Sequence, residues 1–239
     1  MSAEVWKSAE LANTYLKGIR GAIPHANDQI AMMLRLVQAA VPSPKRILDL
    51  GCGDGILGNV LLNKYPDAEA VFVDFSEVML AAARQRIKKQ ATFLQLDYGE
   101  LGWDAVVGEF GRYDIIISGF SIHHQPDARK REIYAEIYHL LANGGIFLNI
   151  EHVKSADSWI ASRFDELFID ALFAYQNQIG SDVTHEQVAH GYHTRPDTAA
   201  NILAPVETQC DWLREIGFEH VDCYLKILEL AVFGGVRKG

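Results

Sequence analysis

Short apolar runs alternate along the chain with stretches of helical periodicity. Five short runs, most of them apolar on both faces, predict strands at residues 46–50, 70–74, 92–96, 113–118 and 145–151. Such strands are typical of parallel sheets that helices cover on both sides. The clearest helical pattern has its apolar positions on one face between residues 133 and 141, and ends at the glycine-containing turn 143–145. This alternation predicts an α/β fold.

The pattern changes after residue 151, where roughly fifty-five residues pass before the next sheet-type run. A long apolar stripe at 160–175 predicts a helix, and a His-rich polar stretch at 184–195 predicts a broken helix. A further helix is expected near 206–216. The alternating runs at 218–227 and 229–236 predict a terminal antiparallel pair of strands.

The first forty residues carry two helical patterns, separated by residues 21–24 and followed by Pro42-Ser43-Pro44. We expect both helices to lie outside the sheet. The sequence therefore predicts an N-terminal helical flap at 1–44 and one α/β domain at 45–239. A helical lid is inserted into that domain at about 152–205.

Composition narrows the classes of partner. The 239 residues include 22 Lys+Arg and 31 Asp+Glu, and the formal net charge of -9 makes nucleic acid an unexpected partner and favours a small molecule. The charged first twenty residues and the absence of an apolar run of ~18 residues predict no membrane contact and a cytoplasmic protein. The three cysteines show no CxxC spacing, so neither a disulfide framework nor a structural zinc site is expected. A homodimer is left open.

The most informative segment is 47–57, in which an apolar strand enters a turn with Gly51, Gly53 and Gly55 and then a helix. Glycines let the backbone turn tightly and approach a ligand closely. The N–H groups at the start of the following helix can face a carboxylate or a phosphate. This arrangement predicts a nucleotide-binding turn.

One aspartate lies at the carboxyl end of each of the first three predicted strands. Asp49 closes the first strand, Asp74 the second and Asp97 the third. The carboxyl ends of parallel strands meet at one edge, where ligands bind in open α/β sheets, so we expect these acids to converge there. Asp74 lies about twenty residues after the glycines, where its two oxygens would accept from a ribose diol. Strand-end turn acids are the plainer alternative.

The segment Asp49-Leu50-Gly51-Cys52-Gly53-Asp54-Gly55 resembles the acid-Gly-x-Gly-x-Gly motif of class I S-adenosylmethionine-dependent methyltransferases. The resemblance spans about residues 46–236 and includes the fourth strand at 113–118 and the turn at 140–147, although Asn143 stands where proline is common. It implies a Rossmann-like, mostly parallel seven-stranded sheet with helices on both faces and an antiparallel C-terminal strand. It also implies that S-adenosylmethionine is the cofactor.

The resemblance assigns the ribose hydroxyls to Asp74 and the adenine to Asp97 and Tyr98. Arg20 would clamp the carboxylate of the cofactor, although a solvated helix end explains this arginine equally well. Aromatic residues would face the sulfonium or the adenine, although core packing explains each of them alone. The expected cofactor-binding residues are Tyr15, Arg20, Asp49, Gly51, Cys52, Gly53, Asp74, Phe75, Met79, Asp97, Tyr98, Ser118 and Phe120.

A looser resemblance points to the carboxy-S-adenosylmethionine synthases of tRNA wobble-uridine modification. It rests on the Tyr15, Arg20 and Ile23-Pro24 start, on Ser121-Ile122-His123-His124 and on the helical insertion before Phe218. Those synthases usually carry a serine at the position of Gly53. We therefore expect ordinary S-adenosylmethionine.

His123 and His124 follow the fourth strand, at the edge where a methyl acceptor would lie. A neutral imidazole there would take the proton of a hydroxyl or amine nucleophile, or would hold the loop by binding a backbone carbonyl. Glu151 and its neighbour His152 end the fifth strand and compete for the same role, which gives His123, His124 and Glu151 as the expected catalytic residues.

The His-rich stretch contains His185, Glu186, His190 and His193, which suggests a metal site at first sight. Helical ligand pairs favour i, i+4 spacing, whereas these histidines are spaced i, i+5 and i, i+3, so no metal is expected. A lid that lines an acceptor pocket or a solvated turn explains the stretch better.

The sequence predicts a methyltransferase that acts by in-line displacement on an N, O or S atom of a small-molecule acceptor. An RNA-modification enzyme related to the carboxy-S-adenosylmethionine synthases would be expected to carry a basic stripe, but the clusters at 84–89 and 129–131 lie on predicted sheet-covering helices. A nicotinamide oxidoreductase expects Gly-x-Gly-x-x-Gly, and here the third glycine comes one residue earlier. A catalytically silent cofactor-binding protein stays open.

Overall fold

The computed structural model describes residues 19–239. The strands are β1 (Arg46–Leu50), β2 (Glu69–Asp74), β3 (Thr92–Gln95), β4 (Tyr113–Gly119), β5 (Leu141–His152), β6 (Phe218–Ile227) and β7 (Leu230–Arg237). The α-helices are α2 (Ala26–Ala40), α3 (Ile56–Lys64), α4 (Glu77–Arg86), α5 (Trp103–Gly108), α6 (Asp127–Leu140), α7 (Ser158–Gln178), α8 (His185–Thr194) and α9 (Val206–Ile216). Short 3-10 helices are η2 (Ile19–Ala22), η3 (Ile122–His124) and η4 (Pro196–Ala200).

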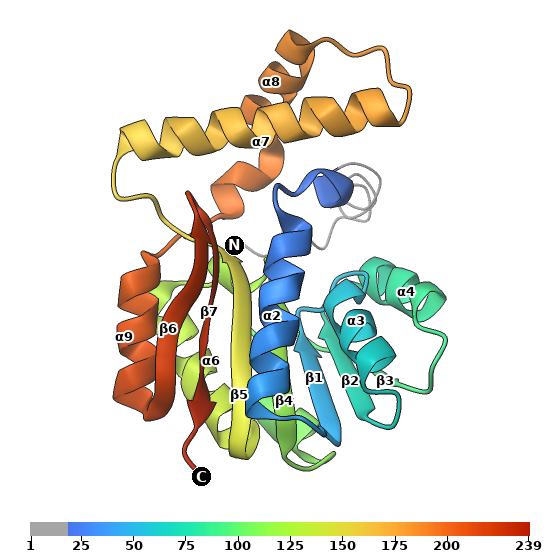
Figure 1. Ribbon diagram of the computed structural model, residues 1–239, viewed down its shortest axis with the longest axis vertical. Coiled ribbons are helices and arrows are strands. Elements are labelled where there is room, and N and C mark those ends of the chain that lie inside the picture. The colour runs from blue at the N-terminus through green and yellow to red at the C-terminus, as the bar shows by residue number, and fades with distance from the viewer. Residues whose placement is uncertain (1–18) are drawn as a thin grey trace.

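The strands form one seven-stranded sheet in the order β3-β2-β1-β4-β5-β7-β6 (Figure 1). Strands β1 to β5 pair in parallel, and β7 is antiparallel to both of its neighbours. This confirms the expected Rossmann-like sheet with an antiparallel C-terminal strand. The strand order reverses beside β1, between β1 and β4, which places the ligand crevice of such sheets at their carboxyl ends.

Two apolar cores cover the two faces of the sheet. Helices α5, α6 and α9 pack on one face and α2, α3 and α4 on the other. The position of α2 corrects our expectation that both N-terminal helices lie outside the sheet, because Met33 and Val37 of α2 are fully buried against it. The apolar face of α2 covers β5 and β7, which would otherwise expose Ile146 and Val232. The flap interpretation therefore stays a prediction only for the residues before α2.

The fifth strand begins earlier than the sequence predicts. Helix α6 ends at Leu140, and Leu141 is already extended and pairs with Tyr113. The chain then passes through Gly144, whose φ is 75°, before the register resumes with Ile146 opposite Ile115. The glycines expected to cap the helix therefore form an irregularity inside the strand instead.

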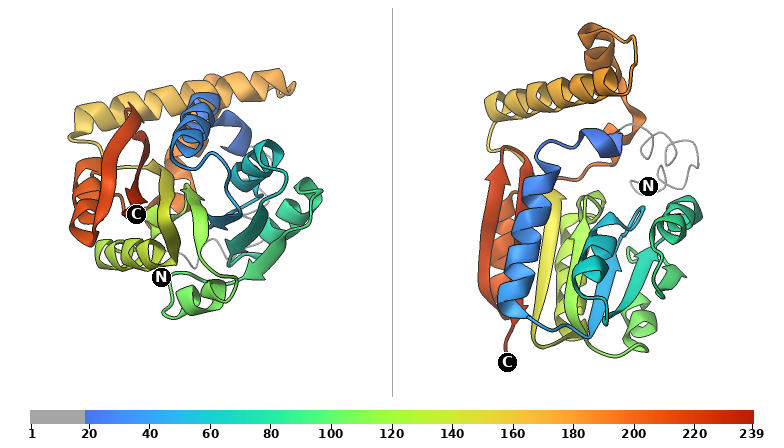
Figure 2. Two further views of the ribbon diagram at one scale, coloured as in Figure 1. Left: turned by 60° about the horizontal axis from the view of Figure 1, so that its bottom comes forward. Right: turned by 45° about the vertical axis from the view of Figure 1, so that its right-hand side comes forward.

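Helices α7 and α8 lie beyond the carboxyl ends of the strands, as Figures 1 and 2 show. Helix α7 confirms the helix predicted from the apolar stripe at 160–175. The predicted broken helix at 184–195 is wrong, because α8 is continuous and begins with a capping box between Thr184 and Gln187. Segment η2 packs under α7, where a Cβ added to Gly21 would come within 2.4 Å of the Tyr175 ring. Among residues 19–239, no helix is long and apolar enough to cross a bilayer.

Candidate functional site

A cavity of about 490 Å³ opens at the carboxyl edge of the sheet, beneath α7 and α8. Its floor comes from the glycine turn after β1 and from the ends of β2, β4 and β5, and its cover from α7, α8 and η4. Nine of the predicted site residues line it: Gly51, Cys52, Gly53, Asp74, Phe75, Met79, Phe120, His123 and His124. The fold therefore brings most of the predicted site to one place.

The glycine turn needs glycine for two different reasons. Gly51 and Gly53 have φ values of 66° and 53°, which disfavour residues with a side chain. A Cβ added to Gly51 would lie 2.0 Å from the Oγ atom of Ser121, whereas one added to Gly53 would meet nothing within 4 Å. Gly51 therefore allows close packing inside the protein, and Gly53 leaves its backbone open to the cavity.

Asp74 ties the second strand to this turn. Its Oδ2 accepts from the N–H of Gly53 at 2.9 Å, and its Oδ1 accepts from the N–H of Ser76 at 2.8 Å. The carboxyl group is buried on the cavity wall, and burial raises its pKa to about 6, although both backbone donors oppose this shift. Each carboxylate oxygen can accept a second donor, so the backbone bonds orient Asp74 without saturating it.

Four predicted cofactor residues do not line the cavity. Asp49 is buried below it, and its Oδ2 caps the start of α3 by accepting from the N–H of Gly58 at 2.8 Å. Asp97 is half-buried and accepts from the N–H of Gly99, and Ser118 donates to the carbonyl of Leu50. The hydroxyl of Tyr98 lies 2.6 Å from Ser121 Oγ. These side chains support the turn and the loops around the cavity rather than forming its wall.

Two further cofactor predictions fall outside the described structure. Tyr15 precedes the described residues, and the side chain of Arg20 is not among those described. Their predicted roles stay predictions.

The end of β4 is strained and faces the cavity. Phe120 has a φ of 50°, which is uncommon for a residue with a side chain, and its N–H donates to the carbonyl of Ile150 on β5. This turn directs the chain into η3, which carries His123 and His124. The strained turn thus holds two imidazoles at the cavity floor.

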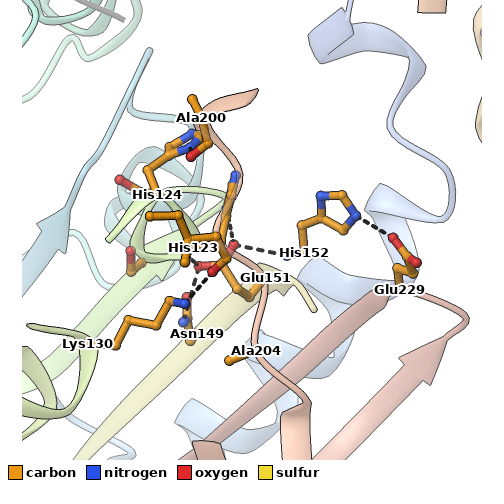
Figure 3. Close-up of polar contacts among 12 residues, drawn as sticks. His123, His124, Lys130, Asn149, Glu151, His152, Ala200, Ala204 and Glu229 are labelled. Atoms are coloured by element: carbon orange, nitrogen blue, oxygen red, sulfur yellow. Dashed lines mark hydrogen bonds and ion pairs between the residues drawn. The ribbon is translucent and has the colours of Figure 1, made fainter. Parts of the chain in front are cut away.

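The buried pair of His123 and Glu151 is the most specific feature of the site (Figure 3). His123 Nδ1 lies 2.6 Å from Glu151 Oε1, and the backbone N–H of His123 donates to Glu151 Oε2 at 3.0 Å. Burial lowers the pKa of His123 well below its ordinary value, and nearby His152 and Lys130 act in the same direction. Burial also raises the pKa of Glu151, although the backbone N–H donors of His152 and His123 oppose this shift. His123 is therefore a neutral imidazole with one face on the cavity.

The other two predicted catalytic residues take different positions. Glu151 does not line the cavity and reaches it only through His123, so it is a positioning residue. His124 lines the cavity, but its Nδ1 faces the carbonyl of Ala200 at 3.1 Å, and burial lowers its pKa to about 3. Its contact with a backbone carbonyl is the loop-holding alternative considered from the sequence.

His152 forms a second histidine–carboxylate pair at the same edge. Its Nε2 lies 2.6 Å from Glu229 Oε2, and the other carboxylate oxygen accepts from Ser155. Figure 3 shows Glu151 turned toward Asn149 and His123, while His152 reaches to Glu229. The ring centroids of His152 and His123 are 5.8 Å apart, and both rings line the cavity.

A methyltransferase-domain family model matches residues 47–145, from β1 into β5. A carboxy-S-adenosyl-L-methionine synthase of Campylobacter lari is 23% identical over 227 residues, which are 94% of this chain and 91% of the relative. Among solved structures, an O-methyltransferase family protein from Burkholderia thailandensis has a TM-score of 0.60 at 15% identity, over 89% of this chain and 58% of that one. A magnesium protoporphyrin IX methyltransferase from Synechocystis PCC 6803 has a TM-score of 0.58 at 17% identity, over 90% of this chain and 84% of that one.

The family-model match to residues 47–145, together with the fold, supports a class I S-adenosylmethionine-dependent methyltransferase. The residues present fit the cofactor of this family. The backbone at Gly53 is open to the cavity, and the carboxyl group of Asp74 lies beside it, as hydroxyl donors of a ribose require. The aromatic rings of Phe75 and Phe120 line the same cavity.

Sequence reasoning assigned no site role to several residues that line the cavity. Ser121, Asn201, Arg195 and Asp197 all line the cavity. Ser121 lies in the quoted motif before His123, and its position there is the one signal that would have identified it. The other three come from η4 and its flanks, far along the chain, and only the fold brings them to the end of β4.

The His-rich stretch gives no metal centre in the described part of the chain. No group of three or more His, Cys, Asp or Glu side chains that would hold a metal occurs among residues 19–239. His185 contacts Asp170 at 2.9 Å, and His190 and His193 are exposed on α8.

Proposed function

We propose that this enzyme transfers a methyl group from S-adenosylmethionine to a hydroxyl oxygen of a small-molecule acceptor, with His123 as the general base. The observation that carries the proposal is the buried His123–Glu151 pair, which faces the cavity beside the glycine turn. The cofactor supplies an activated methyl group, whose transfer needs alignment and exclusion of water rather than a metal.

On this proposal, the glycine turn and Asp74 hold the adenosyl group. The open backbone at Gly53 admits it, and the Asp74 carboxylate accepts from its two ribose hydroxyls. Because two backbone donors fix the carboxylate, it keeps its orientation before the cofactor binds. This preorganisation supports assigning Asp74 to binding rather than to a structural turn.

His123 accepts the proton of the acceptor hydroxyl at the ring nitrogen that does not face Glu151. A carboxylate only accepts hydrogen bonds, so the nitrogen facing Glu151 carries the proton of the neutral ring and the other nitrogen has a lone pair. Asn201 lines the cavity together with His123, on the side where the acceptor hydroxyl would lie. Glu151 then stabilises the imidazolium that forms.

Helices α7 and α8 with η4 act as the lid in this proposal. Phe164, Phe168 and Leu172 of α7 are spaced four residues apart and all face the cavity. An apolar cover of this kind excludes water from the acceptor. The homodimer and the absence of nucleic-acid partners stay predictions.

A turnover assay with labelled S-adenosylmethionine tests the proposal. The purified chain is incubated with hydroxyl, amine and thiol acceptors, and mass spectrometry follows both the acceptor and the nucleoside product. We expect a methylated hydroxyl compound and S-adenosylhomocysteine. Cofactor binding without transfer would instead indicate a silent protein, and a carboxylated cofactor would indicate the reaction for which the Campylobacter lari relative is named.

A further inference from the structure

The acceptor side of the cavity has an apolar cover and no unbalanced positive charge. Phe164, Phe168 and Leu172 cover it. Within the described structure, the charged side chains that line this side are Arg195 and Asp197, whose Nε and Oδ2 atoms lie 3.5 Å apart. The Arg195 guanidinium also stacks 3.9 Å from the Tyr192 ring centroid and donates to the Tyr192 carbonyl. Because Asp197 balances Arg195, this side disfavours an anionic acceptor.

His152 adds a second imidazole, and its contact with Glu229 defines which ring nitrogen carries the proton. Glu229 is largely buried, and its carboxylate faces the Nε2 atom of His152 at 2.6 Å. When the ring is neutral, Nε2 therefore carries the proton, and Nδ1 accepts. The ring also contacts Phe164 of the lid, with centroids 5.1 Å apart, so His152 lies where the apolar cover meets the floor.

A third acceptor atom lies at the same cavity. Asp197 is 8% exposed and lines the cavity, and its Oδ1 atom is buried without a hydrogen-bond partner. An unsatisfied buried acceptor costs free energy unless a ligand donates to it. Together with the ring nitrogens of His123 and His152 that do not face a carboxylate, it gives three acceptor atoms on residues that line the cavity. These atoms favour a ligand that donates hydrogen bonds.

We propose that the acceptor is an uncharged aromatic compound with two neighbouring hydroxyl groups, one bound by His123 and the other by His152. This inference rests on the proposed function and adds the substrate class. Both rings line the same cavity with their centroids 5.8 Å apart, close enough for one small ligand to donate a hydroxyl group to each ring. His123 takes the proton of the attacked hydroxyl, and His152 accepts from the other hydroxyl without removing its proton.

The test compares catechol, phenol and salicylate as acceptors. For the unmodified enzyme we expect kcat/KM for catechol to exceed that for phenol by about tenfold, the effect of one additional hydrogen bond, and salicylate to be the poorest. His152→Phe keeps an aromatic ring against Phe164, and Glu229→Gln lets the ring nitrogens exchange their roles. Both changes should bring the catechol-to-phenol ratio toward one. His190→Phe, on the exposed face of α8, is the matched control and should keep the ratio.

The outcomes separate the substrate class from the reaction. If phenol and catechol are methylated equally by the unmodified enzyme, or if His152→Phe keeps the ratio, the inference is overturned while hydroxyl methylation stands. A preference for salicylate also overturns it, in favour of a carboxylate acceptor held by Arg195. If cofactor binds but only amines or thiols are methylated, the proposed hydroxyl chemistry fails, and the inference fails with it.

Discussion

The Nδ1 atom of His123 lies 2.6 Å from Oε1 of Glu151, and the two side chains are 7% and 1% exposed. Glu151 is the last but one residue of β5, while His123 lies on η3 after the neighbouring strand β4. The backbone N–H groups of His123 and His152 also donate to this carboxylate. The pair is therefore fixed by the sheet edge itself, and the imidazole has little freedom to turn away from the cavity.

His123→Ala should abolish most of the methyl transfer and leave cofactor binding unchanged. A positioned general base contributes typically about 10²–10⁴-fold to a rate, so we expect a loss in kcat of this order. Glu151→Gln should have a smaller effect, because the amide oxygen still accepts from Nδ1 but carries no charge to stabilise the imidazolium. Single-turnover rates and calorimetric titration of the cofactor measure the two effects separately. Full activity of His123→Ala would remove this residue from the mechanism.

Asp74 should make cofactor binding depend on pH. Burial raises its pKa to about 6, so the carboxyl group is largely protonated below that pH. A protonated carboxyl group accepts fewer hydrogen bonds, so affinity for S-adenosylmethionine should rise as pH rises through about 6. The stability of the cofactor-free protein should change in the opposite direction. Between about pH 4 and about pH 6, Asp74 is protonated in the native state and ionised in the unfolded chain. The native state therefore binds more protons, and its stability falls as pH rises through this window.

Calorimetric titrations on both sides of that pH check this dependence. Asp74→Asn is the matched control, because the amide does not titrate and should give a flat profile. Asp74→Ala should weaken cofactor binding by at least ~1.5–3 kcal/mol at neutral pH, the value typical of hydrogen bonds to a charged group. An unchanged dissociation constant in Asp74→Ala would show that the ribose hydroxyls bind elsewhere.

The two glycines of the turn should respond differently to the same substitution. Gly51→Ala combines a φ of 66° with a Cβ that would lie 2.0 Å from Ser121 Oγ. Gly53→Ala has a similar φ of 53° but meets no protein atom within 4 Å. The backbone strain of about 1–2 kcal/mol is common to both, so urea unfolding should show a larger loss for Gly51→Ala. Gly53→Ala should instead have its larger effect on the affinity for the cofactor, because its Cβ would enter the cavity and meet no protein atom. Equal losses of stability would mean that the Ser121 side chain moves aside freely.

The sheet was largely predictable from local patterns. Runs such as 46–50 and 113–118 are apolar on both faces, and burial between two helical layers leaves few other structures for them. The carboxyl-edge rule also placed Asp74 and His123 correctly at the cavity, because it depends only on strand direction. Asp49 and Asp97 also lie at strand ends, but they do not line the cavity, since position at a strand end does not fix where a side chain points.

Other features required the folded chain. The apolar pattern of α2 is the same for a flap and for a helix that covers the sheet. The sequence alone therefore does not decide that its Met33 face packs on the sheet. The pairing of His152 with Glu229 joins residues 77 positions apart and follows from the antiparallel return of β7. Asn201 and Asp197 reach the cavity through η4, a short segment with no periodicity to interpret.

Lys130 should prove necessary for activity although it does not line the cavity. It is fully buried on α6, and its Nζ contacts Asp127 Oδ1 at 2.7 Å and the carbonyl of Ile202. The segment 200–202 also binds the histidine loop directly, because Ile202 N–H donates to the His123 carbonyl at 3.0 Å. Lys130 therefore holds the segment that packs on the catalytic loop.

Lys130→Met keeps the length of the side chain but leaves the Ile202 carbonyl without this donor, which should cost about 1–3 kcal/mol of unfolding free energy. It should also lower kcat, because the segment 200–202 is then less firmly held against the loop that carries His123. Lys89→Met is the matched control: Lys89 also donates to a carbonyl, that of Leu62, but between α3 and the segment that follows α4, away from the cavity. Urea unfolding and turnover under saturating cofactor measure both variants. If both lose stability and both keep kcat, the segment at 200–202 does not govern the orientation of His123.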